Sequence, residues 1–481
     1  MKSGDASRFW RAEPRRVDEV VTVALSLVVR AAVVAWAHGR FPPADDGKFY
    51  HVVADRIAHG LGYTWQWPDG VVTYAAHYPV GYPALMGAGY AVFGSSPTVA
   101  MALNAFIGTL GVWAVYRLAS FNRKRGPAVV AGVVAALHPS LVFYTPALMT
   151  EGVTAALLAV LGWLAVTARA RGIGWLVALG LLSGVLVLVR PQALVLAPVL
   201  GAVAGVDGWP SRLRRAALVT VLALGVCLPW TLRNCSRLDH CAFVSANGGW
   251  NLFIGSAEKA TGRWVSIDEL GVPDECRNEF GEAGKDRCFG RAGTRNIREH
   301  PVHFLKLIPA KLSATFDWSG APGHYLHSSN GALVDEHGKL QLGIAEALYQ
   351  RIVLLLGFVG VGLAPGPRRG ARMLAAALSA VWLFRPEAWL SHLLLVLLVA
   401  SFGRSLWSRP AWLLGAAAVL ATAVTHAVFF GAGRYGLVCV LLLVAFAAEG
   451  LAALGGGKRP FVEARRLAPS LLSFDSRSSG E

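Results

Sequence analysis

Two adjacent carboxylates, Asp45 and Asp46, follow the first long apolar segment of the chain, residues 17–38. A carboxylate beside apolar surface can have a raised proton affinity, and it can then take a proton from an attacking hydroxyl or amine group. Either residue could also cap the amphipathic helix expected in GKFYHVVADRIAHG, because an aspartate at a helix start accepts backbone N–H bonds. The pair alone leaves both interpretations open, a general base and a helix cap.

A third acidic candidate, Glu151, stands near the start of another apolar segment, and His77 lies between it and the two aspartates in the sequence. Glu151 could orient an acceptor or share a metal ion, or it could cap the helix that follows. His77 could coordinate a metal or contact a phosphate, although a single histidine is more often a hydrogen-bonded structural residue. Together these groups could hold a divalent ion, but their spacing defines no particular metal site.

Basic residues at the far ends of several apolar segments break the prevailing charge pattern of the chain. Such side chains can reach lipid headgroups, which costs little at a membrane interface. Collectively they could instead bind a phosphate, because a guanidinium group matches two phosphate oxygens. The candidates for phosphate binding, in order of preference, are Arg233, Arg434, Arg190, Lys311 and Arg263.

Aromatic side chains accompany these groups. Tyr50, Trp65, Trp67 and Trp250 could stack on a sugar ring, but tryptophans outside a bilayer also anchor proteins at the headgroups. The glycines after Asn247 are not a phosphate-binding loop, because no strand–loop–helix pattern surrounds them.

The elements that must position these groups are predicted from hydropathy. Of the 481 residues, 54% are hydrophobic and 15% are charged, which is too apolar for one soluble domain. Apolar runs recur at about the 20 residues that cross a bilayer as a helix, and lipid offers no partners to open backbone groups. We therefore expect an all-α polytopic membrane protein with about 12 transmembrane helices, or about ten if short segments such as 373–384 do not span.

The formal net charge of +16 could suggest a nucleic-acid partner, but most lysines and arginines lie in short links between apolar runs. This distribution follows the positive-inside rule and places both termini in the cytoplasm. No polybasic, aromatic surface of the kind that binds nucleic acid is evident in the sequence, so we expect no nucleic-acid partner.

The chain divides into five predicted parts. Residues 233–343 stand out because they are polar, rich in glycine and without an apolar run long enough to span. The parts are a cytoplasmic basic segment, 1–16; a transmembrane module, 17–232, with a first external loop at 39–95; an extracytoplasmic domain, 233–343; C-terminal transmembrane helices, 344–454; and a disordered cytoplasmic tail, 455–481.

Four of the six cysteines, Cys235, Cys241, Cys276 and Cys288, fall in the predicted extracytoplasmic domain. Disulfides persist outside the cytosol, and the even number fits two bridges. Four cysteines allow three pairings, of which the local one joins Cys235 to Cys241 and Cys276 to Cys288. A zinc site is the weaker interpretation, because no pair has Cys-x2-Cys spacing.

Short motifs over most of the chain resemble those of one group of membrane enzymes. They are Asp46-x-x-x-Tyr50, Tyr78-Pro79-x-Gly81-Tyr82-Pro83, Thr150-Glu151, Arg190-Pro191, Leu228-Pro229-Trp230-Thr231-x-Arg233-Asn234, Asn247-Gly248-Gly249-x-Asn251-Leu252 and Arg434-Tyr435. Together they resemble the GT-C-fold glycosyltransferases, and among them the bacterial members of the protein O-mannosyltransferase superfamily (glycosyltransferase family 39-like), which includes the lipid A aminoarabinose transferases. Two departures are Asp45-Asp46 in place of an Asp-Glu pair, and Tyr78 where the aminoarabinose transferases have lysine.

The resemblance implies an inverting, mannosyltransferase-like enzyme of the bacterial inner membrane whose active site faces the extracytoplasmic side. Its donor would be a sugar on a polyprenyl phosphate with the lipid tail between helices, and its acceptor an unidentified protein, glycolipid or wall polymer. Asp46 would be the base by its spacing to Tyr50, with Asp45 as second choice and Glu151 as partner. No cofactor is implied beyond a possible divalent metal ion. The residues expected to contact substrate are Tyr50, His77, Tyr78, Tyr82, Asn247 and Trp250.

Two other functions remain open. A transporter or flippase of a lipid-linked substrate would place ionisable residues at the middle of its spans. A non-catalytic membrane assembly protein could retain the same fold. The enzymatic interpretation makes a geometric prediction: Asp46, Glu151 and a basic pair should converge at one place on the external side.

Overall fold

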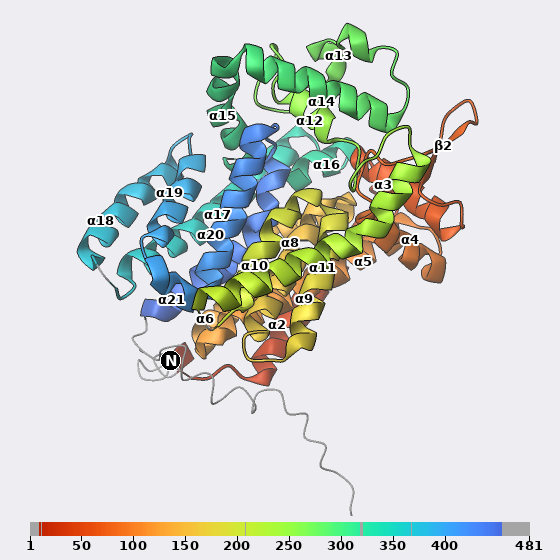
Figure 1. Ribbon diagram of the computed structural model, residues 1–481. Helices are drawn as coiled ribbons and strands as arrows, with labels where there is room; N and C mark the ends of the chain where they lie inside the picture. Colours follow the sequence, from red (N-terminus) through yellow and green to blue (C-terminus); the bar gives the residue numbers. More distant parts are fainter. Residues whose placement is uncertain (1–8, 11, 207, 318–320, 367, 455–481) are drawn as a thin grey trace, which may run out of the picture.

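The structure is a computed structural model, and it describes residues 9–10, 12–206, 208–317, 321–366 and 368–454. Helices dominate these residues, and the most apolar ones stand side by side in a bundle (Figure 1). The helices of the bundle are α2 (Arg16–Ala37), α5 (Pro97–Ala119), α6 (Arg125–Ala136), α8 (Thr150–Thr167), α9 (Ile173–Val189), α10 (Ala197–Ala204), α11 (Gly208–Arg237), α17 (Glu336–Leu363), α18 (Arg369–Ala380), α19 (Trp389–Ala400), α20 (Pro410–Val428) and α21 (Val440–Leu454).

Seven helices among the described residues are long and apolar enough to cross a membrane, and the bent pair Arg125–Ala136 with Pro139–Ala147 would make an eighth. The predicted fold class, an all-α polytopic membrane protein, is therefore confirmed. The predicted count of ten to twelve spans is not confirmed, because Ile173–Val189, Pro191–Ala204 and Trp389–Ala400 form shorter apolar helices. Proline explains two breaks between apolar helices. Pro139 begins the second half of the bent pair, Pro191 follows Ile173–Val189, and neither can continue the hydrogen-bond ladder of the helix before it.

A smaller set of elements covers one end of the bundle, which we call the loop end (Figure 1). They come from two separate parts of the chain, before α5 and between α11 and α17. Strands β1 and β2 pair antiparallel, with Thr64 opposite Tyr74. The elements are α3 (Asp46–Ala58), β1 (Thr64–Gln66), β2 (Val72–Tyr74), α4 (Gly81–Phe93), α12 (Gly248–Ile254), α13 (Ile267–Leu270), α14 (Glu282–Glu299), α15 (Pro301–Phe316) and α16 (Ala321–Ser329).

Short helices connect the longer ones. Five of these eight among the described residues begin at a proline or glycine or directly after one, at positions where the chain changes direction. They are α7 (Pro139–Phe143) and the 3-10 helices η1 (Ser120–Asn122), η2 (Thr145–Ala147), η3 (Pro191–Leu196), η4 (Asp274–Cys276), η5 (Val381–Phe384), η6 (Gly403–Ser408) and η7 (Gly433–Cys439).

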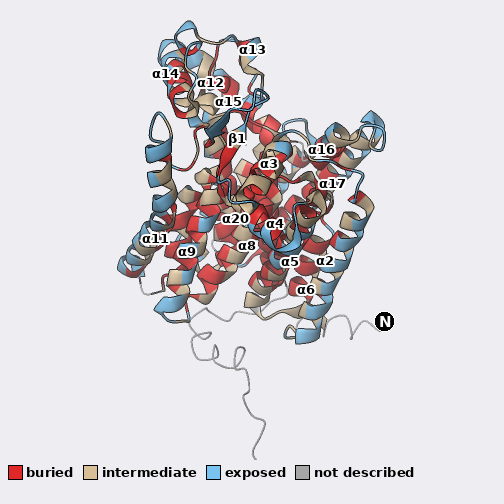
Figure 2. Ribbon diagram, turned by 90° about the vertical axis from the view of Figure 1, so that its right-hand side faces the viewer, coloured by how far each residue is buried: buried red, intermediate tan, exposed pale blue. Residues whose placement is uncertain are grey.

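The molecule has a large core inside the bundle and a second core at the loop end. Figure 2 shows buried residues along the inner faces of the bundle helices and exposed residues on the outer faces of α11 and α2. The second core contains Phe253 of α12, Phe289 of α14 and Leu307 of α15. Phe430 and Tyr435, which flank the start of η7, belong to this second core. The α12–α15 region is thereby packed onto the end of α20.

The predicted domain borders are offset from the helix ends. Helix α11 continues past residue 233 to Arg237, and residue 344 lies inside α17. The predicted tail 455–481 lies outside the described residues, as do residues 1–8 and 11 of the N-terminal segment.

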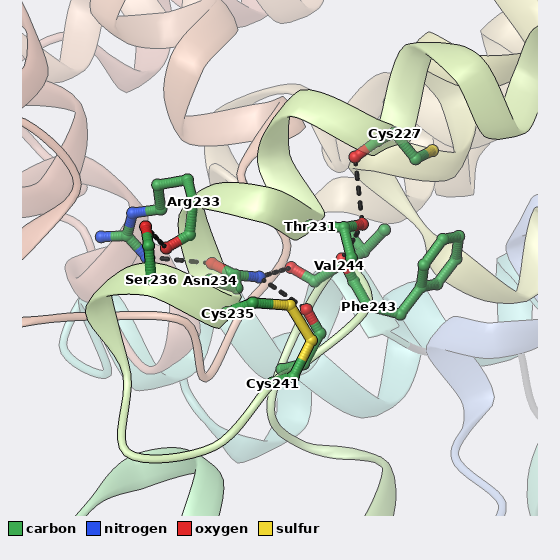
Figure 3. Close-up of a disulfide and its surroundings, with 10 residues drawn as sticks. Cys227, Thr231, Arg233, Asn234, Cys235, Ser236, Cys241, Phe243 and Val244 are labelled. Atoms are coloured by element: carbon green, nitrogen blue, oxygen red, sulfur yellow. Dashed lines mark hydrogen bonds between the residues drawn. A yellow bond between two sulfur atoms is a disulfide. The ribbon is translucent and has the colours of Figure 1, made fainter.

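Two disulfides join Cys235 to Cys241 and Cys276 to Cys288, which is the local pairing considered from the sequence. Figure 3 shows the first, just where α11 ends. There, Asn234 donates to the carbonyl oxygens of Ala242 and Val244 at 3.2 and 3.4 Å. These bonds hold residues 242–244 against the last turn of α11, so the chain folds back at the end of that helix.

Candidate active site

The two acidic residues predicted to act together meet at one guanidinium group at the loop end. Arg434 donates from Nη1 to Asp46 Oδ2 at 2.7 Å, and its Nε lies 3.7 Å from Glu151 Oε1. Glu151 Oε1 also accepts from Arg190 Nη1 at 2.9 Å. Asp46, Arg434, Glu151 and Arg190 therefore alternate in charge, and we call them the four-residue cluster. The convergence expected from the sequence is present in the structure.

Asp46 is the first residue of α3, and Asp45 precedes it at the N-cap position. Asp45 has φ 49° and makes no side-chain capping bond. The oxygens of Asp46 instead accept from Arg434 and from the Tyr78 hydroxyl, the latter at 2.7 Å to Oδ1. The helix-cap interpretation is therefore wrong for Asp45. Asp46 accepts hydrogen bonds from side chains in two other parts of the chain.

Glu151 lies in the first turn of α8, where the partial positive charge at the helix start favours a carboxylate. Its Oε2 accepts from the Tyr144 hydroxyl at 2.5 Å. Its partner Arg190 follows the last residue of α9, at the point where Pro191 turns the chain into η3. The side chains of Glu151 and Arg190 are only 2% and 8% exposed, so this ion pair is nearly removed from solvent.

Arg434 is placed by the tight connection between α20 and η7. Gly431 donates to the carbonyl of Gly262 at 2.9 Å, and a Cβ on Gly431 would lie 1.9 Å from the carbonyl oxygen of Lys311. Glycine is needed there because the backbone of α15 approaches so closely. Beyond this contact, Arg434 also donates to the Tyr325 hydroxyl at 2.7 Å.

Opposing effects act on the proton affinity of Asp46. Burial raises the pKa of this carboxyl, but the charge of Arg434 and the hydrogen bonds from Tyr78 and Arg434 outweigh it, and the pKa is lowered. Burial, together with the Asp46 charge, raises the pKa of Tyr78 well above its usual value. Burial lowers the pKa of His77, against the charge of Asp46. At neutral pH Asp46 is thus an ionised acceptor that faces a neutral phenol.

The two carboxylates differ in access. The Asp46 side chain is 21% exposed, compared with 2% for Glu151. Both oxygens of Glu151 are engaged, Oε1 with two arginines and Oε2 with Tyr144. A substrate group can therefore reach Asp46, while Glu151 holds the two guanidinium groups in place.

Aromatic rings surround Asp46. The ring of Tyr78 lies 5.2 Å from that of Tyr50 and 5.0 Å from that of Phe49, centroid to centroid. His77 lies edge-to-face with Trp250 at 5.6 Å. Tyr78 therefore contacts the cluster directly, through Asp46. The other aromatic residues in this group reach it through ring contacts: Tyr50 and His77 pack on Tyr78, and Trp250 packs on His77.

A cavity opens beside Arg190 between α8, η3, α20 and η7. Arg190, Gln192 and His426 supply polar groups to its wall. The rest of the lining is chiefly apolar and includes Leu158, Leu196, Ala418, Ala421 and Val438. Charged, polar and apolar groups meet in this cavity, whose free space is about that of one or two water molecules.

Three of the predicted phosphate-binding residues lie outside the cluster. Arg233 donates to the carbonyl oxygens of Ala75 and Tyr63 at 2.8 and 2.7 Å. Lys311 is fully buried and its Nζ lies 3.2 Å from the carbonyl oxygens of two α20 residues. Arg263 is exposed, and its backbone forms a bridge with that of Gly431. Of the predicted cations, Arg434 and Arg190 are the ones that reach the carboxylates.

Two predicted substrate contacts also lie elsewhere. The ring of Tyr82 packs edge-to-face on Tyr50 at 5.4 Å, but Tyr82 is fully buried and its hydroxyl donates to Asn104 Oδ1 at 3.0 Å, on the side of the bundle core. Asn247 precedes α12 and accepts a hydrogen bond from Ser245 at 3.0 Å. The corrected set keeps Tyr78 as the aromatic residue that touches the candidate base.

Sequence reasoning missed Tyr144 and Tyr325, which bind Glu151 and Arg434. Tyr144 could have been found, because it stands only seven residues before Glu151, in the short connection that leads into α8. Tyr325 is 109 residues from Arg434, and no motif in the sequence connects them.

The donor set at this site does not fit a divalent metal ion. Both carboxylates already face guanidinium groups, whose charge would repel a cation. No group of three or more His, Cys, Asp or Glu side chains is placed to hold a metal within the part of the chain that the structure describes.

Comparison with known proteins adds a family resemblance. Residues 77–232 match the family model of dolichyl-phosphate-mannose-protein mannosyltransferases. This stretch includes Tyr78, Glu151 and Arg190, so the resemblance inferred from the sequence is confirmed over that part of the chain. A search of curated proteins finds no match.

Two of the solved structures that are similar to this chain are an oligosaccharyltransferase and ArnT. The apo oligosaccharyltransferase of Archaeoglobus fulgidus is 12% identical, with 90% of this chain and 50% of that chain covered and a TM-score of 0.45. ArnT from Cupriavidus metallidurans bound to undecaprenyl phosphate is 16% identical, with 90% of this chain and 77% of that chain covered and a TM-score of 0.41. The chain thus spans about half the length of the oligosaccharyltransferase.

Proposed function

We propose that the protein transfers a sugar from a polyprenyl-phosphate donor to an acceptor hydroxyl or amine, with inversion at the anomeric carbon. The observation that carries this proposal is the contact of Arg434 with both Asp46 and Glu151, next to the cavity at Arg190. The family match over residues 77–232 supports it, because that family is described by a lipid-phosphate sugar donor and an acceptor protein.

Asp46 acts as the base in this proposal. The acceptor oxygen or nitrogen attacks the anomeric carbon, its proton passes to an Asp46 oxygen, and the bond from the anomeric carbon to the phosphate oxygen breaks. The electron pair of that bond leaves with the lipid phosphate. A lipid phosphate is a good leaving group, so no second carboxyl is needed as an acid. The engagement of both Glu151 oxygens agrees with a role other than proton transfer.

Cations stabilise the phosphate as it leaves. Arg434 and Arg190 are the candidates, because they lie on either side of Glu151 and Arg190 also lines the mostly apolar cavity. A fixed guanidinium costs no reorganisation when charge develops on the phosphate. The hydrocarbon tail would follow apolar residues of this wall such as Leu158, Leu196 and Val438, which requires the cavity to widen when the donor binds.

The test uses the purified full chain in lipid vesicles with polyprenyl phosphates that carry different radiolabelled sugars. The proposal predicts that label leaves the lipid in the presence of a membrane extract containing acceptors, and that the new glycosidic bond has the opposite anomeric configuration. Retention of configuration would contradict the mechanism. Absence of label loss with every donor would contradict the function.

Glu346 favours a second candidate, the movement of a lipid-linked substrate across the membrane. This residue lies within α17 and is fully buried, and among the residues that the structure describes its carboxylate oxygens make no hydrogen bond of good geometry. An ionisable residue inside a span is a feature of transport paths. The same vesicles separate the two functions, since a flippase would expose labelled lipid on the other leaflet without loss of the sugar.

A further inference from the structure

Two carboxylates one turn apart on α14 bind the backbone of the segments that border the site. Glu282 Oε2 accepts from the N–H groups of Ala76 and His77 at 2.5 and 2.9 Å. Asp286 Oδ1 accepts from the N–H group of Trp250 at 3.0 Å. Residues i and i+4 share one face of a helix, so α14 reaches both segments at once.

The segment held by Glu282 leads directly to the candidate base. Tyr78 follows His77 in the chain, and its hydroxyl donates to Asp46 Oδ1 at 2.7 Å. The His77 ring packs on Trp250, the residue whose N–H group Asp286 holds. A continuous series of contacts therefore connects α14 with Asp46.

Residues 75–77 have no regular secondary structure to satisfy their backbone groups. Ala76 is fully buried, and its carbonyl accepts from the N–H group of Ala246 at 2.7 Å. Arg233 binds the carbonyl of Ala75. Without Glu282, the two adjacent N–H groups would be buried without partners, which is unfavourable enough to move the segment.

The rest of α14 is fixed in a way that keeps both carboxylates in place. The Cys276–Cys288 disulfide closes a loop of the chain that contains Glu282 and Asp286. On the other side, Gly249 packs so closely that an added Cβ would lie 1.8 Å from the carbonyl oxygen of Asp286. The first half of α14 is therefore held against both the disulfide loop and α12.

We infer that Glu282 and Asp286 are positioning residues, which set Tyr78 and thereby Asp46 through the backbone of residues 76–77 and 250. This role rests on the proposed function for the part that Asp46 plays. The carboxylates act as hydrogen-bond acceptors, so a side-chain amide of the same shape can replace each one. A substitution that removes the acceptor frees the segment.

Amide hydrogen exchange tests the positioning without any catalytic readout. In the full chain in lipid nanodiscs, Glu282→Ala should raise exchange at residues 76–77 by about tenfold or more. Glu282→Gln should exchange like the wild type. Asp274→Ala is the matched control, because the Asp274 side chain is 88% exposed and lies just before the same disulfide loop. Unchanged exchange in Glu282→Ala would overturn the inference, whatever the protein catalyses.

Transfer kinetics test the connection to the site. We expect Glu282→Ala to lower kcat by about tenfold to a hundredfold, with the KM for the lipid donor changed by less than about twofold, because the base is misplaced and donor contacts remain. Glu282→Gln should restore kcat. Faster exchange at residues 76–77 with unchanged kcat would contradict the positioning role. A loss in Glu282→Gln equal to that in Glu282→Ala would also contradict it, since charge would then matter.

Removing the disulfide provides a second route to the same result. A Cys276→Ser, Cys288→Ser variant should raise exchange at both 76–77 and 250, because both carboxylates lie within its loop. A Cys235→Ser, Cys241→Ser variant is the control for exchange at residue 250 alone, because that disulfide closes a different loop whereas its neighbours Arg233 and Ala246 bind residues 75–76. Equal exchange at residue 250 in the two variants would count against a special role for α14.

Discussion

Arg434 contacts Asp46 at 2.7 Å although the two residues are 388 positions apart in the chain. The same guanidinium group lies 3.7 Å from Glu151 and so brings the start of α3, the start of α8 and the connection after α20 to one point. We expect Arg434→Lys to lower kcat/KM by about a hundredfold or more, because an ammonium group cannot reproduce the planar set of donors. Steady-state transfer kinetics measure this. Arg263→Lys, on an exposed position nearby in space, is the control and should be unaffected.

The buried pair of Glu151 and Arg190 should matter for stability as well as for catalysis. Glu151→Gln keeps an acceptor for Tyr144 but leaves a buried guanidinium without a full counter-charge, so we expect a loss of about 3 kcal/mol in the free energy of unfolding. The thermal midpoint in detergent reports this change. Glu336→Gln is the control, because the Glu336 side chain is 72% exposed, and its midpoint should equal that of the wild type. A midpoint for Glu151→Gln that also equals the wild type would argue against the ion pair.

The pH dependence of transfer follows from the lowered pKa of Asp46. A depressed carboxyl pKa means that the ionised base, and its contribution to stability, is present above the usual value of 3.8 and is lost as pH falls through the lower value. Tyr78→Phe removes one of the hydrogen bonds that lower this pKa, so the acid limb of the kcat/KM profile should move to higher pH. Tyr74→Phe is the control, since Tyr74 is an exposed residue of β2. An acid limb that stays at the wild-type position in Tyr78→Phe would show that Asp46 does not set it.

Close backbone approach at Gly431 supplies a prediction about the position of Arg434. An alanine there would place its Cβ 1.9 Å from the carbonyl oxygen of Lys311, so α15 and the segment before η7 must move apart. We expect Gly431→Ala to reduce kcat/KM by more than about tenfold and stability by about 1–3 kcal/mol. Gly225→Ala on α11, where nothing lies within 4 Å, should keep activity and leave stability unchanged or slightly raised. Full transfer activity in Gly431→Ala would mean that this contact does not place Arg434.

The sequence was sufficient for the fold class and for the carboxylates of the cluster, for physical reasons. Apolar runs of membrane length can hardly be anything but helices. The carboxylate pair alone left a helix cap open, and Asp46 and Glu151 were chosen by their places in the motifs. Arg434 and Arg190 were found because each stands at the end of an apolar segment. The sequence could not separate them from Arg233 and Lys311, because an arginine that binds backbone carbonyls looks the same in one dimension as an arginine that binds a carboxylate.

Other features depended on packing that no short motif records. The role of Tyr325 arises from the approach of α16 to η7, two elements that are distant in the chain. The number of spans was not settled by hydropathy, because hydropathy does not show where proline breaks an apolar run into shorter helices, as at Pro139 and Pro191. Tyr82 was assigned to the site by its place in a motif, whereas its side chain points into the bundle core and binds Asn104.

The identity of the base is the central claim, and Asp45 offers a matched comparison one residue away. The Asp45 side chain is 42% exposed and lies 3.9 Å from the ring of His324, which is charged only when protonated, whereas Asp46 binds Arg434 and Tyr78. The most direct measurement is therefore the transfer of radiolabelled sugar from polyprenyl phosphate by Asp46→Asn and Asp45→Asn in the same vesicles at equal expression. We predict a loss of about a hundredfold or more for Asp46→Asn and less than about threefold for Asp45→Asn. Equal transfer by Asp46→Asn and the wild type would contradict the assignment of Asp46 as the base.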